Sequence, residues 1–153
     1  MQTKRYLVLF VLAVAILATA RQAAPPADPN GIIYLDADKV AAAFAKGGPL
    51  IPADPSRNFF VLAGRRDSGP GQVELHTVDT DVFYVLEGSG MFVTGGKMLD
   101  GKETAPNEQR GSSIEGGQTR TLKKGDVIVI PKGVPHWFRQ ISPPFLYFVV
   151  KVH

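Results

Sequence analysis

Two of the three histidines in this chain lie in runs of residues that are predicted to form β-strands. His76 follows Glu74 by two positions, and side chains alternate along a strand, so these two groups share a face. The next run begins at Asp81, and an antiparallel return would bring it close to His76. His136 opens a third run, whereas His153 is the last residue of the chain. Two imidazoles and two carboxylates on inward faces would form a four-ligand site for a cation.

Each of these residues also has a plainer interpretation. A single histidine on an apolar strand is commonly a satisfied core or surface residue. Glu74 could be a solvated strand residue or an uncoordinated base, and Asp81 could form a local turn bond. The pair Arg65 and Arg66 is expected to be a solvated loop charge. Metal binding therefore depends on whether the separate runs converge.

The elements that would position these residues are one short helix and many strands. Asp36 or Asp38 can cap a helix over residues 39–46, and Gly47 and Gly48 can end it. Runs rich in β-branched and aromatic residues follow at 58–63, 72–78, 82–86, 91–94, 119–122, 127–130, 136–141 and 145–152. This pattern predicts an all-β barrel or sandwich.

Two segments between these runs have turn or loop composition. The Gly-Ser-Gly sequence at 88–90 predicts a tight hairpin between two of the runs. Residues 95–117 are polar and rich in glycine, and they are predicted to form a long loop with either a functional or a merely connecting role.

Composition excludes several classes of function. The chain has 153 residues, is 44% hydrophobic and 20% charged, and contains no cysteine. Disulfides, thiolate metal ligands and a cysteine nucleophile are therefore excluded. Removing Lys4 and Arg5 with a leader leaves 15 basic residues against 14 acidic ones. No basic run remains, so nucleic acid is not an expected partner.

The N-terminus has the three parts of a secretory signal peptide. Lys4 and Arg5 precede an apolar run at 7–18, and the small residues Ala18 and Ala20 come before a cleavage point after Ala20. The run is too short for a membrane-spanning helix, which needs roughly 20 residues. We predict a signal peptide at 1–20, a flexible linker at 21–30, an N-terminal arm with the helix at 31–57 and a barrel at 58–153. The mature protein would be periplasmic or secreted, with no stable membrane span.

One motif in the second half of the chain resembles a motif of the cupin superfamily at all positions but one. That motif runs Gly, five residues, Pro, one residue, Gly, two residues, His, three residues, Asn. Here Gly125, Pro131, Gly133 and His136 stand at those positions, with Gln140 in place of Asn.

The other cupin motif is similar only in part. Its final glycine is Gly88, its acidic ligand position is Asp81, and its second histidine is His76. Glu74 then occupies the first histidine position. The alternative register would place Val78 and an aromatic residue at ligand positions, which leaves them without donor atoms.

The resemblance covers about residues 58–150 and implies a double-stranded β-helix, a small jelly-roll-like barrel with a metal between its sheets, and often a homodimer. The implied metal ligands are Glu74, His76, Asp81 and His136. Two carboxylates would neutralise a divalent ion, with Fe, Mn and Zn as candidates. Alternation along the strands gives as pocket candidates Phe83, Phe92, Phe138 and Gln140.

The function implied is that of an exported single-domain cupin acting on a small molecule, with dioxygenase-, isomerase- or lyase-like chemistry. The catalytic residues are not predicted, since one fold supports many reactions. The main alternative is a noncatalytic module that binds a small ligand, with or without metal. A barrel with a purely structural role is a third possibility.

Overall fold

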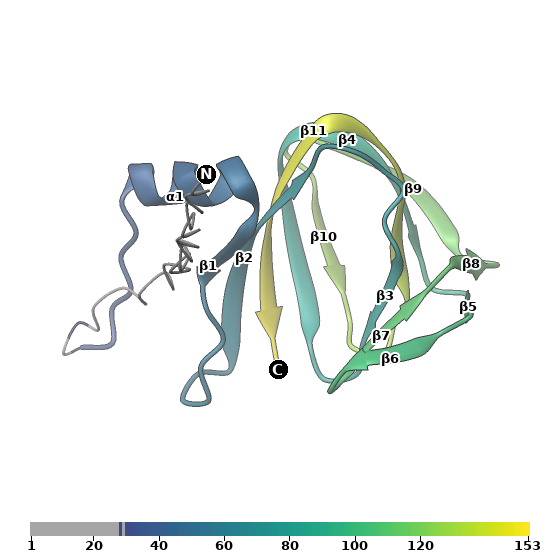
Figure 1. Ribbon diagram of the computed structural model, residues 1–153, viewed down its shortest axis with the longest axis horizontal. Coiled ribbons are helices and arrows are strands. Elements are labelled where there is room, and N and C mark those ends of the chain that lie inside the picture. The colour runs from purple at the N-terminus through teal and green to yellow at the C-terminus, as the bar shows by residue number, and fades with distance from the viewer. Residues whose placement is uncertain (1–27, 29) are drawn as a thin grey trace, which may run out of the picture.

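The computed structural model describes residue 28 and residues 30–153 (Figure 1). The predicted signal peptide and most of the predicted linker lie outside the described residues. One helix is followed by strands only: α1 (Ala37–Lys46), β1 (Gly48–Ile51), β2 (Phe59–Arg66), β3 (Val73–His76), β4 (Thr80–Thr94), β5 (Lys97–Leu99), β6 (Lys102–Ala105), β7 (Glu108–Gly111), β8 (Ser113–Glu115), β9 (Gln118–Lys123), β10 (Val127–Ile130) and β11 (His136–Val152).

Strand β11 connects the parts of the curled sheet. Its C-terminal half pairs with β2 on one side and with β4 on the other, while its first residue pairs with β3. Strand β4 also pairs with β9 and β10, and β3 continues into β7 and β6. All of these pairs are antiparallel, and the sheet curls around an interior (Figure 1). The predicted all-β jelly-roll-like barrel is confirmed.

The predicted hairpin at residues 88–90 is wrong, because β4 continues through it. Ser142 of β11 pairs with Ser89, but the next paired residue, Leu146, faces Glu87. Residues 143–145 therefore bulge opposite Gly88, which has a φ of 77°. The glycine accommodates a close approach of the facing strand, rather than a chain reversal.

We expect Gly88→Ala to lower the free energy of unfolding by about 1–3 kcal/mol, since a Cβ there would collide with the Pro144 carbonyl oxygen. Gly125→Ala is the matched control. Gly125 also has a positive φ, of 93°, but open space around its missing side chain. Urea denaturation of both variants checks the prediction. Equal losses would show that backbone strain alone, and not the close approach, requires glycine at 88.

Residues 95–117 were expected to be a long loop, but they form strands β5 to β8. Strand β7 pairs along the whole of β3, from Val73 with Gly111 to His76 with Glu108. Alternation gave no signal here, because the strands are only three or four residues long and β6 is fully exposed. The segment therefore extends the sheet beyond β3, the strand that contains Glu74 and His76.

Helix α1 packs outside the barrel. Asp36 caps it by accepting a hydrogen bond from the Lys39 backbone nitrogen at 2.9 Å, and Gly47 ends it with a φ of 74°. Phe44 faces Phe148 of β11 with 5.3 Å between ring centroids. The helix thus covers the outer face of β2 and β11 (Figure 1). Within the described residues, no helix is long and apolar enough to cross a bilayer.

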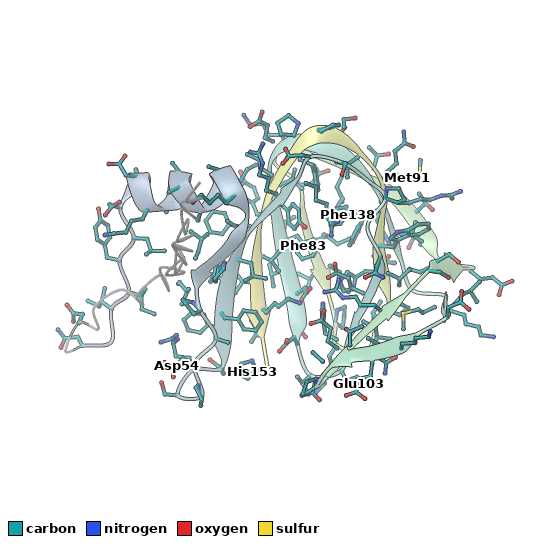
Figure 2. All side chains as sticks on the ribbon, viewed as in Figure 1. Asp54, Phe83, Met91, Glu103, Phe138 and His153 are labelled. Atoms are coloured by element: carbon teal, nitrogen blue, oxygen red, sulfur yellow. The ribbon has the colours of Figure 1, made fainter. Side chains whose placement is uncertain are left out.

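The main core fills the barrel with aromatic rings. Phe138 is 3% exposed and lies 4.4 Å from Phe92 and 5.9 Å from Phe83, centroid to centroid. Figure 2 shows Phe83 and Phe138 pointing into the interior. The buried members are Phe83, Val85, Phe92, Leu122, Ile130, Phe138, Phe145, Tyr147 and Val149. This core forms one end of the interior, and polar groups occupy the other.

Candidate metal centre

Four predicted site residues enter the barrel from three strands. Glu74 and His76 lie on β3, Asp81 lies near the start of β4, and His136 is the first residue of β11. The register places His136 opposite Glu74 on the neighbouring strand. His76, Asp81 and His136 are each less than 5% exposed. The cross-strand pairing and the short β3–β4 connection therefore bring these residues together.

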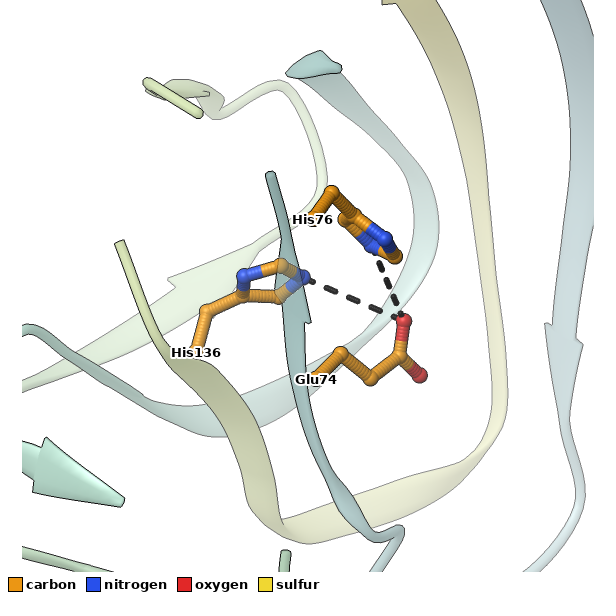
Figure 3. Close-up of side chains that lie close together, drawn as sticks. All are labelled: Glu74, His76 and His136. Atoms are coloured by element: carbon orange, nitrogen blue, oxygen red, sulfur yellow. Dashed lines mark ion pairs between the residues drawn. The ribbon is translucent and has the colours of Figure 1, made fainter. Parts of the chain in front are cut away.

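The imidazoles converge on the carboxylates through their Nε2 atoms. His76 Nε2 lies 3.6 Å from Glu74 Oε2 and 3.5 Å from Asp81 Oδ2. The corresponding distances from His136 Nε2 are 3.9 and 3.6 Å. Figure 3 shows both rings directed at the same oxygen of Glu74. These separations are too long for hydrogen bonds.

The unpartnered histidine nitrogens fit a bound cation. Both Nε2 atoms are buried and have no hydrogen-bond partner among the described residues. His136 Nδ1 lies 3.1 Å from the Val134 carbonyl oxygen, which can only accept, so Nδ1 bears the proton in the neutral ring. The lone pair on Nε2 then faces carboxylate oxygens, and a cation placed between them would satisfy both. The donor set of imidazole nitrogen and carboxylate oxygen suits a divalent transition metal.

Each carboxylate already has a cationic partner. Glu74 Oε1 lies 2.5 Å from Arg110 Nη1 and 3.4 Å from Arg66 Nη2, which leaves Oε2 facing the histidines. Lys151 Nζ donates to both oxygens of Asp81, at 2.7 and 2.8 Å. One ligand atom each from Glu74, His76 and His136 lies within 4.8 Å of the other two. Asp81 lies beside this trio, but its oxygens are engaged by Lys151.

The protonation states match those of metal ligands. Burial by itself would raise the pKa of Glu74, but the nearby His76 ring and the charge of Arg110 outweigh it, and the pKa lies well below its usual range. Burial lowers the pKa of His136 more than the facing carboxylates raise it. At neutral pH Glu74 is therefore an anion and His136 is neutral, which are the forms that bind a metal ion.

Three charged residues of the site were missed in the sequence. Arg66 was expected to be a solvated loop charge, which is wrong: it lies half-buried at the end of β2, 4.7 Å above the Phe138 ring. Arg110 lies in the segment expected to be a loop. Lys151 is 7% exposed, and alternation with Val149 on β11 could have placed it inside.

The site borders a cavity of about 40 Å³. Its lining residues are Arg66, Gln72, Glu74, Asp81, Phe83, His136, Phe138, Tyr147, Val149 and Lys151. Of the pocket candidates, Phe83 and Phe138 line it, and Phe92 packs behind them. Gln140 does not reach the cavity but is exposed, because a register shift between Phe138 and Gln140 interrupts the alternation.

The structure is similar to solved structures of several proteins. A protein from Bacillus halodurans matches with a TM-score of 0.53 and 13% identity, over 83% of this chain and 86% of its own. A DMSP lyase from Ruegeria pomeroyi matches with a TM-score of 0.50 and 19% identity, over 70% of this chain and 46% of its own. A polyketide cyclase from Streptomyces resistomycificus matches with a TM-score of 0.47 and 23% identity, over 69% of this chain and 63% of its own. This chain thus matches less than two thirds of the lyase and of the cyclase.

Sequence comparison gives the family directly. No protein of curated function matches the chain. The family model described as Cupin matches residues 57–153, which is more than half of the chain and includes every strand from β2 to β11. The barrel, the motif ending at His136 and this match agree, and the chain belongs to the cupin family.

Proposed function

We propose that this protein is an exported cupin enzyme that binds one divalent metal ion and acts on a small molecule. The observation that supports this most strongly is the pair of buried, unpartnered Nε2 atoms facing one carboxylate oxygen. His76, His136 and Glu74 would hold the ion, with Asp81 beside them. Fe²⁺, Mn²⁺ and Zn²⁺ suit this donor set. Export rests on the signal-peptide pattern in the sequence.

The role of Glu74 in this proposal is that of a ligand rather than a base. Arg110 and Arg66 contact its other oxygen, and its pKa lies well below the usual range. A carboxylate of such low pKa is a poor proton acceptor at neutral pH. The same low pKa keeps it charged at the acidity where most glutamates become protonated.

The chemistry proposed is of the dioxygenase, isomerase or lyase type. A bound divalent ion supplies a Lewis acid that polarises a substrate oxygen. Phe83 and Phe138 exclude water from one wall of the cavity. Burial raises the pKa of Tyr147, so its hydroxyl remains protonated and can donate a hydrogen bond to substrate, while it accepts one from Arg66 Nε at 3.1 Å. A reactivity screen with and without oxygen would separate these classes, and ligand stabilisation without turnover would favour a binding module.

Metal analysis tests the centre itself. We expect purified or reconstituted wild-type protein to contain roughly one ion per chain, and His136→Ala to lose most of it, because a ligand is removed. His153→Ala is the matched control, since His153 contacts Arg57 and Asp79 instead of the site residues. Elemental analysis gives the result. Wild-type protein that takes up none of Fe²⁺, Mn²⁺ or Zn²⁺ would refute the proposal.

A further inference from the structure

We propose that the cavity binds a small carboxylate and that Lys151 selects for its charge. This inference rests on the proposed metal centre and names the class of ligand that the centre accepts. It follows from the balance of charges around the cavity, from the donors that remain there, and from the size of the space.

The charges are balanced before any ion binds. Arg66, Arg110 and Lys151 face three carboxylates, those of Glu74 and Asp81 and that of Glu108, which also contacts Arg110. A divalent ion adds two positive charges that no further carboxylate among these contacts offsets. Uncompensated charge in a mostly buried site is costly, so an anionic ligand is favoured over a neutral one.

The residues that line the cavity also retain hydrogen-bond donors. An ammonium group has three N–H donors, and Lys151 uses two of them on Asp81, which leaves one for a ligand. Arg66 uses Nε on Tyr147 and Nη2 on Glu74, and its Nη1 fits beside Gly71, where a Cβ would collide with it. Arg66 and Lys151 both line the cavity and have more N–H donors than these contacts use, a combination that suits carboxylate oxygens.

The space limits the ligand to a small group. The cavity of about 40 Å³ corresponds to roughly three water molecules at about 10–15 Å³ each. Side-chain exposure falls from 21% at Arg66 and Glu74 to 9% at Lys151 and 2% at Asp81. The Lys151 end is therefore closed and the Arg66 end reaches solvent. A carboxylate would enter toward Lys151, with the rest of the molecule toward Arg66.

Calorimetry on the Mn²⁺-loaded protein tests this, with pyruvate as the anionic probe and pyruvamide as its neutral counterpart. We expect wild type to bind pyruvate at least about tenfold more tightly than pyruvamide. Because any Mn²⁺ ion prefers a carboxylate, the decisive variant is Asp81→Asn/Lys151→Met, which removes both members of the pair and keeps the net charge. It should retain Mn²⁺, because the candidate ligands Glu74, His76 and His136 are unchanged, and lose most of that preference. Loss of Mn²⁺ by this variant would make Asp81 a ligand and overturn its assignment to the charge-selecting pair. Lys124→Met, at an exposed position, should leave the preference unchanged.

The outcomes separate this inference from the proposed function. Full Mn²⁺ content with equal affinity for both probes would overturn the anion selectivity and leave the metal centre intact. Retention of the wild-type preference by the double variant would show that Lys151 does not select the charge. Failure of wild type to take up Mn²⁺, Fe²⁺ or Zn²⁺ by elemental analysis would overturn the proposed function and this inference together.

Discussion

Lys151→Met is expected to lower the free energy of unfolding by about 3–5 kcal/mol in metal-free protein, the usual loss when one partner of a buried ion pair is removed. Asp81 is 1% exposed, and both of its oxygens accept hydrogen bonds from Lys151. Without the lysine, a buried carboxylate has to remain charged without its partner or take up a proton. Urea denaturation at neutral pH in the presence of a chelator measures the loss.

The double variant Asp81→Asn/Lys151→Met is the control for this prediction. It removes the charge that the single variant leaves unpaired, so we expect it to recover much of the lost stability. Adding Mn²⁺ should also recover part of it in the single variant, since Asp81 would then be free to join the ligands. If the single variant were as stable as wild type, Asp81 would be neutral or solvated in the folded protein, and the ion pair would not hold the closed end of the cavity.

Phe138→Ala should also lower the free energy of unfolding by about 3–5 kcal/mol, as expected for the loss of a buried phenylalanine. Its ring lies 4.4 Å from Phe92 and about 5 Å from Phe145 and Tyr147, all between centroids. It also lies under the Arg66 guanidinium, at 4.7 Å. The variant therefore leaves a space in the core and removes the aromatic ring against which the Arg66 guanidinium packs.

Two further variants bracket the effect of Phe138→Ala. Phe138→Leu keeps most of the apolar volume and should lose clearly less stability. Tyr34→Ala removes an aromatic ring that is 75% exposed and should change the free energy of unfolding by less than about 0.5 kcal/mol. Denaturation curves of all three variants give the comparison. A loss at Phe138 no larger than at Tyr34 would mean that the barrel interior is not closely packed around this ring.

Interpretation of the sequence succeeded where the pattern is local. A period of two places Glu74 and His76 on one face of β3, and in the structure both side chains lie inside the barrel. The motif from Gly125 to His136 identified the family that the sequence comparison confirms. Helix α1 was also predicted, because its cap, its apolar face and its terminal glycine are neighbours in the chain.

Errors arose where contacts between distant strands override local composition. The Gly-Ser-Gly sequence at 88–90 is typical of a turn, but β4 continues through it, and Gly88 lies opposite the bulge on β11. Gln140 follows the inward parity of Phe138, but a register shift turns it to solvent. The polar segment 95–117 forms strands because β7 finds a partner in β3.

The sequence by itself therefore determined the fold, the family and the residues whose donor atoms could meet. Only the tertiary structure decided which atoms are free to bind an ion, because that depends on Arg66, Arg110 and Lys151. These residues lie on three different strands and reach the carboxylates only after the barrel closes. Alternation along a strand is a property of neighbouring residues, whereas the pairing of buried charges is set by cross-strand register and packing.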